Sequence, residues 1–314
     1  EKVPDGIYEF YGRQFDRLTE SNSSLDLMKP VRFIVMSREP LHVECLQELL
    51  GVTKKERQAL LRVLSVFFPV RGDRIHVYHK SVTDWLLDEE DVYHDEDDFG
   101  VDAAQTHDEL KERCLALLSD FTATVASDKK NRGLYAFAEK KLVAVSSGKS
   151  CMEGLSFALR HVVHHAVLSG DLASAREVLL RHDWLIARAM LGDAVSIKAD
   201  CELYLRACEE QDDAVHYLQR CMQQSLTGLG RNKAWICGEL VGRLMSLESR
   251  NEDFKRLLDA VRGFKGFDWY CPMNPGLAQA DDPCLSVLEG HTKSVCSVSW
   301  GQSAEGRALL ASGS

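Results

Sequence analysis

The sequence of 314 residues is long for one domain and suits two or three. Hydrophobic residues make up 45% of it and charged residues 27%, a balance that argues against extensive disorder. The net charge of −10 argues against nonspecific binding to nucleic acid or to an anionic membrane surface. No apolar run approaches the ~18 residues that a membrane-spanning helix needs.

The ten cysteines indicate the compartment. None of them forms a C-x-x-C pair, and most lie singly within apolar helical patterns. Zinc sites need close ligand pairs, and disulfide frameworks are typical of shorter secreted chains. We therefore expect buried free thiols in a reducing, cytoplasmic setting.

Residues 1–28 are predicted to be mainly helical. Apolar side chains, Phe15 and Leu18 among them, recur at helical spacing. Small polar residues at 21–24 interrupt the pattern.

Residues 29–88 are predicted to form a winged-helix domain. Thr53 with Glu56 forms a capping box at the start of one of its helices. Gly72-Asp73 lies between alternating apolar residues and predicts a short hairpin. A further helix is expected from Ser81. Three helices, a hairpin and a following helix are the order of elements in a winged helix.

An acidic stretch follows this domain. Eight of the eleven residues at 88–98 are Asp or Glu. Such a run is usually a solvated linker, here placed at 89–104, and the alternative is a docking site for a basic partner surface.

Residues 105–270 are predicted to be mostly helical. Apolar stripes recur at helical spacing, and pairs of helices are expected at about 198–226 and 232–262, separated by the glycines of 228–230. Because one pair cannot bury its apolar side alone, we expect helical hairpins that stack. No repeat consensus identifies the kind of solenoid.

The C-terminal part changes character. Residues 271–284 contain three prolines and a glycine, which predicts a linker. Residues 285–314 alternate apolar and polar side chains with a period of two, which predicts strands. The fold class predicted overall is mainly α, with a winged helix, a hairpin-stack region and a short C-terminal β segment.

This C-terminal segment resembles the opening of a WD repeat at Gly290-His291, 295–300 and 310–314. In that family the matching His supports each blade through a Ser–Asp–Trp hydrogen-bond chain. The resemblance implies this structural role for His291, with Ser312 or Ser314 supplying the Ser.

The first 90 residues resemble the end of the nucleotide-binding module of STAND-class signalling NTPases of the NACHT and NB-ARC type. The similar stretches are Pro4 to Tyr11, Ser37 to Leu41, Glu48 to Gly51 and Val77 to Leu86. The resemblance implies a piece of a longer protein, divided into the end of a helical subdomain at 1–28, a winged helix at 29–88, an acidic linker at 89–104, a helical repeat-like region at 105–270, a linker at 271–284 and an incomplete first WD repeat at 285–314.

The resemblance also implies a function. It is regulatory and scaffolding, with the winged helix clamping an ADP state and the WD repeats binding protein partners. ATP or ADP would be the cofactor of the parent and not of this chain. The winged helix would contact the missing nucleotide-binding domain, and the parent could form homo-oligomers on activation.

His79 is the residue that the resemblance singles out, as the imidazole that contacts the β-phosphate of ADP. An imidazole N–H can donate to a phosphate oxygen. The alternative is a packed His that ends a strand and caps local backbone.

Two further motifs have structural alternatives. Ser147 to Ser150 copies the end of a phosphate loop, but Val143 stands where the first Gly should be, so a loop between helices is favoured. His161 and His165 share a helical face as zinc ligands do. Val162 stands where a zincin has Glu, which favours a polar-lined helix face without metal.

Two other functions are open. A DNA-binding winged helix would use the basic residues Lys54, Lys55, Arg57, Arg62, Arg71 and Arg74. The net charge and the acidic run oppose it. An NTPase within this chain would need a phosphate loop and a metal-holding Asp after a strand, and the sequence shows neither, so we expect no enzyme.

Overall fold

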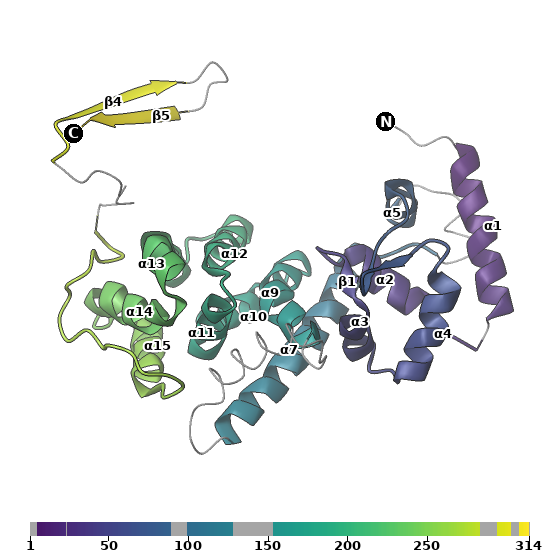
Figure 1. The fold of residues 1–314 in the computed structure, drawn as a ribbon, viewed down its shortest axis with the longest axis horizontal. Helices are drawn as coiled ribbons and strands as arrows, with labels where there is room; N and C mark the ends of the chain where they lie inside the picture. Colours follow the sequence, from purple (N-terminus) through teal and green to yellow (C-terminus); the bar gives the residue numbers. More distant parts are fainter. Residues whose placement is uncertain are drawn as a thin grey trace. The chain divides into compact units, whose positions relative to one another are not determined.

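The computed structural model describes residues 5–22, 24–88, 99–127, 153–282, 294–302 and 308–313 (Figure 1). The chain is mainly α-helical, as the sequence predicts, with a few short antiparallel strands. It divides into two compact units, residues 1–281 and residues 282–314.

The N-terminal elements alternate helices with very short strands. They are α1 (Asp5–Ser21), α2 (Met28–Met36), β1 (Leu41–His42), α3 (Val43–Leu50), α4 (Lys54–Leu64), β2 (Val70–Arg71), β3 (Arg74–Ile75) and α5 (Lys80–Leu86). The strands form one antiparallel sheet in the order β1-β3-β2, in which Ile75 pairs with both Leu41 and Val70. Helix, strand, two helices and a hairpin follow one another as in a winged helix.

Local sequence signals account for the ends of these elements. Thr53 and Glu56 form the predicted capping box at the start of α4. Gly51 ends α3 in the left-handed conformation, with φ of 68°. Gly72 and Asp73 both have positive φ, which gives the two-residue turn between β2 and β3 the twist that a hairpin needs.

An aromatic cluster joins α1 to the end of this part. The rings of Phe15 and Phe67 stack with centroids 4.8 Å apart, and Phe15 also contacts Trp85 and Phe99. Phe15, Trp85 and Phe67 are buried. Large aromatic surfaces buried together give α1 and α5 fixed positions relative to each other.

A run of helices makes up the rest of the first unit. They are α7 (Ala103–Ser127), α9 (Glu153–Leu168), α10 (Leu172–Leu179), α11 (His182–Met190), α12 (Ala194–Ala207), α13 (Asp213–Arg231), the 3₁₀ turn η1 (Lys233–Trp235), α14 (Ile236–Leu244), the 3₁₀ turn η2 (Met245–Leu247) and α15 (Glu252–Gly263). Neighbours in sequence pack on one another, as in α7 with α9 and α12 with α13. Helix α9 also packs on α3, and α7 packs on α2, so the two parts of this unit share a core.

The predicted break at the glycines of 228–230 is wrong. Helix α13 continues through them to Arg231, and Asn232 then starts η1 by accepting the amide of Ala234. Packing explains Gly228, because a Cβ there would lie 2.6 Å from an Oε1 of Glu239, whereas a Cβ at Gly230 would meet no atom within 4 Å. Gly228 therefore allows α13 and α14 to approach closely and does not end the helix.

The end of the first unit is a docked segment, although its composition predicts a linker. The Gln279 side chain is buried and donates to the carbonyls of Gly242 and Leu277, both at 2.7 Å. The Ala280 amide donates to the carbonyl of Arg243. Residues 277–281 therefore form a strap along α14.

The second unit contains a hairpin, β4 (Ser297–Gln302) with β5 (Ala308–Gly313). The strands are antiparallel, with Trp300 opposite Leu310. Trp300 is 75% exposed, and Val298 and Leu310 are also exposed. None of the helices in the described part of the chain is long and apolar enough to cross a membrane.

The described cysteines are free thiols. Five are buried, namely Cys45, Cys114, Cys201, Cys221 and Cys237. Burial raises the pKa of Cys221 and that of Cys237 to about 12. Cys271 and Cys296 are exposed.

Candidate functional site

His79 lies at the surface, immediately before α5. Its backbone is extended, and it is the N-cap residue of that helix. The ring nitrogen Nδ1 accepts the amide N–H of Ser81 at 3.2 Å. The side chain is exposed, so the alternative role, capping local backbone, is present together with an accessible imidazole.

A hydrogen-bond chain fixes the His79 ring. Ser81 Oγ lies 2.7 Å from His79 Nδ1, and the hydroxyl of Tyr11 on α1 lies 2.6 Å from Ser81 Oγ. Because Nδ1 accepts the Ser81 amide, the neutral ring carries its proton on Nε2. Nε2 has no partner within the described ranges and is available to donate.

The charges beside this imidazole include an exposed cation. Lys80 pairs with Asp84 at 3.0 Å across one turn of α5. The Lys80 side chain is 84% exposed, so the pair is weak and leaves the ammonium accessible to an anion.

The structural residues expected in the WD-like segment are only partly described. Gly290 and His291 lie outside the described residues. Ser312 lies on β5, opposite Val298 on β4. The supporting role predicted for His291 stays a prediction.

The two histidines considered as zinc ligands are buried in α9. His165 contacts His107 of α7, with the two Nδ1 atoms 2.8 Å apart. Burial lowers the pKa of His165 to about 2, so it is neutral at pH 7. No group of three or more potential ligands occurs among the residues that the structure describes. His161 and His165 do share a helical face, but that face is packed inside the protein.

The phosphate-loop-like Ser147 to Ser150 and Val143 lie outside the described residues, as does most of the acidic run, 89–98.

The basic residues considered for DNA contact do not form one exposed row. Arg57 is buried in α4, and Arg74 donates to the carbonyl of Pro40 at 2.8 Å. Lys54, Lys55 and Arg62 are exposed on α4. The hairpin and the helix therefore offer fewer free cations than the sequence suggests.

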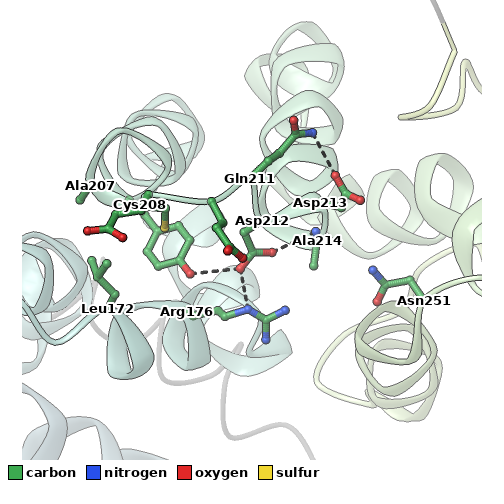
Figure 2. A pocket seen from close by; sticks show the side chains of 12 residues that line it. Leu172, Arg176, Ala207, Cys208, Gln211, Asp212, Asp213, Ala214 and Asn251 are labelled. Atoms are coloured by element: carbon green, nitrogen blue, oxygen red, sulfur yellow. Dashed lines mark hydrogen bonds and ion pairs between the residues drawn. The ribbon is translucent and has the colours of Figure 1, made fainter.

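An acidic hollow of about 690 Å³ lies where α10, the turn before α13 and the start of α15 meet (Figure 2). Arg176 donates to Asp212 and to Asp253, both at 2.6 Å. Asp212 also accepts the hydroxyl of Tyr204 and the amide of Ala214. With these bonds made, we interpret the cluster as a structural tie. No sequence pattern indicates it, since the partners are 36 and 77 residues from Arg176.

Comparison of the chain with protein-family models, with curated proteins and with solved structures found no match.

Proposed function

We propose that this chain is a regulatory and scaffolding segment of a nucleotide-switched signal-transduction protein of the STAND class. In the closed state its winged helix would hold ADP in the parent's nucleotide-binding domain. Its C-terminal hairpin would open a WD-repeat propeller that binds protein partners. The chain itself would not be an enzyme, and the parent would act in the cytoplasm and oligomerise on activation.

One observation carries the proposal: the imidazole of His79 is exposed and oriented. Its Nδ1 is held by Ser81, and Ser81 is held by Tyr11, so Nε2 has a fixed place from which to donate. A preorganised donor binds a phosphate oxygen without first losing rotamer freedom.

Two further observations support it. The elements of residues 28–86 follow the order of a winged helix, on which the family's nucleotide contact is carried. The hairpin exposes Val298, Trp300 and Leu310, and exposed apolar side chains on a two-stranded sheet are what further strands of a propeller would cover.

The test is the nucleotide content of the full-length parent, purified with His79→Ala and with His79→Gln. We expect both variants to copurify with less ADP and to release it about tenfold faster or more, because a hydrogen bond to a charged group contributes about 1.5–3 kcal/mol. His216→Ala, on α13 and far along the chain, is the control and should retain ADP like the wild type.

ADP content and release rate are measured by chromatography of the denatured protein and by displacement of a fluorescent ADP analogue. Equal retention in the His79→Ala, His216→Ala and unmodified proteins would refute the clamp. Circular dichroism of each variant separates this outcome from misfolding.

A further inference from the structure

A second hollow, of about 530 Å³, lies between the two parts of the first unit. The loop after α2 forms one side of it, through Arg38 and Glu39. Helix α9 and the turn between α11 and α12 form the others, through Arg160, His161 and Asp193. Its volume is within the range of small-molecule sites.

His161 is a buried polar side chain without hydrogen bonds at this hollow. It is 7% exposed, and neither ring nitrogen has a hydrogen-bond partner within the described part of the chain. Nε2 lies 3.4 Å from an Oε1 of Glu39, a long contact through which His161 lowers the pKa of that carboxyl. A buried polar group without a hydrogen bond destabilises the fold, and such groups mark places where a ligand can bind.

Three arginines surround the same space. Arg160 pairs with Glu39 at 2.7 Å, and the buried Arg188 pairs with Asp193 and Asp200, both at 2.8 Å. The Nε of Arg188 has no hydrogen bond. Arg38 is exposed and makes no hydrogen bond or ion pair with any described residue. The three arginines are balanced by the carboxylates of Glu39, Asp193 and Asp200. Arg38 is the guanidinium among them that no carboxylate of the described residues pairs, so it is the cation open to an anion.

The N-terminus of α12 completes the arrangement. Asp193 precedes this helix of 14 residues but makes no side-chain bond to its first amides. Gly192 and Ser196, on either side of that terminus, also line the hollow. The Ser196 amide already donates to the carbonyl of Asp193 at 3.2 Å, so the amides open to a ligand are those of Ala194 and Val195. Open amides and the helix dipole at an N-terminus attract anions, phosphate above all.

We propose that this hollow binds the phosphate group of a small phosphorylated metabolite. Arg38 would supply guanidinium donors from the loop after α2, and Arg160 and His161 would supply theirs from α9. The first amides of α12 would donate from the third side. A phosphate offers several oxygens and two negative charges, which suits donors that converge from several directions better than a single carboxylate does. A bound anion would link the loop after α2 to α9 and α12. The proposal is independent of the nucleotide contact at His79.

The probe is inorganic pyrophosphate, added to the purified 314-residue chain at constant ionic strength, with citrate in a parallel titration. We expect saturable heat of binding, a raised unfolding temperature and weaker binding of citrate. Arg38→Gln should weaken pyrophosphate binding about tenfold or more without changing the unfolding temperature of the free chain, because Arg38 has no bonds to lose.

Arg17→Gln is the matched control, since Arg17 is also exposed and lies on α1. It should bind pyrophosphate like the wild type. Absence of saturable binding, an equal effect of Arg17→Gln and Arg38→Gln, or tighter binding of citrate than of pyrophosphate would each overturn the proposal.

Discussion

At the residue scale, the contact between α7 and α9 contains two buried histidines, His107 and His165, and the half-buried His164. The rings of His107 and His165 have centroids 5.0 Å apart, and His164 contacts both. Burial lowers the pKa of His164 to about 4 and that of His165 to about 2. These imidazoles are neutral in the folded protein, because charging them would place several cations side by side away from water.

The free energy of unfolding should therefore decrease as the pH is lowered. In the unfolded chain the histidines become protonated near pH 6.5. In the folded chain they stay neutral until the pH reaches their lowered pKa values. Below pH 6.5 the unfolded state binds more protons, so the free energy of unfolding decreases by about 1.4 kcal/mol per pH unit for each such imidazole. Asp200 opposes this from about pH 6 downward, because burial raises its pKa to about 6.

The measurement is urea unfolding at pH 7.5, 6.0 and 5.0. We expect the midpoint to fall as the pH is lowered, and His164→Gln to make the fall shallower by removing one titrating group. A midpoint that is constant or rises toward pH 5 would contradict the assignment of neutral buried imidazoles.

At the element scale, one arginine ties three helices together. Arg176 of α10 binds Asp212, the N-cap of α13, and Asp253, in the first turn of α15. The same Asp212 accepts the amides of Ala214 and Val215. The carboxylate of Asp212 therefore both caps α13 and binds Arg176, and the direction of α13 depends on both interactions.

Replacing Arg176 by Met keeps most of the side chain's apolar length and removes the donors. We expect the free energy of unfolding to fall by about 1–2 kcal/mol, less than two buried charged hydrogen bonds would give, because the site is partly exposed. Arg206→Met, at an exposed position of α12, is the control for denaturant unfolding. Equal midpoints for the two variants would show that the tie contributes nothing.

At the scale of the whole molecule, the strap of residues 277–281 lies where the first compact unit gives way to the second, at Asp282. Gln279 is its anchor on α14, and Asp281 accepts from Ser246 and Arg250. The attachment of the strap consists mainly of hydrogen bonds, so it should open more easily than the helical core.

Gln279→Ala should release the strap. The change leaves the Gly242 carbonyl without this donor and the Ser246 amide without its acceptor, at a cost of about 2 kcal/mol. Hydrogen exchange should accelerate in the strap, notably at the Ala280 amide, and stay unchanged in α7. Asn274→Ala, at an exposed position of the same loop, is the control. Unchanged exchange in the strap of Gln279→Ala would show that Gln279 is not its anchor.

Local signals made much of this fold predictable. The capping box of Thr53 and Glu56 and the turn at Gly72-Asp73 depend on residues a few positions apart, and both occur as expected. The glycines at 228–230 gave a wrong prediction of a helix end, because the conformation at a glycine depends also on what packs against it, as Glu239 does against Gly228. Nothing local indicates that residues as far apart as Gln279 and Gly242 bond.

In the candidate sites, too, local features could be predicted from the sequence, whereas contacts between distant residues could not. The place of His79 before a helix could be read from its neighbours, but its link to Tyr11 spans most of the N-terminal part and could not. The hollow at Arg38 joins segments more than 100 residues apart, Glu39 and Arg160 among them. Pairing over such distances follows from packing and not from spacing.

The inward placement of the thiols has a chemical consequence. Thiolates are the species that alkylating reagents attack, and at a pKa of about 12 only on the order of one in 10⁵ of the Cys221 or Cys237 side chains is ionised at pH 7. Among the described cysteines, Cys271 and Cys296 are exposed. Among the described cysteines, mild maleimide treatment of the native protein would thus label Cys271, which precedes the strap in sequence, and Cys296, beside the hairpin, ahead of the half-buried Cys208. The buried sulfurs of the helical core would stay unmodified until that core unfolds.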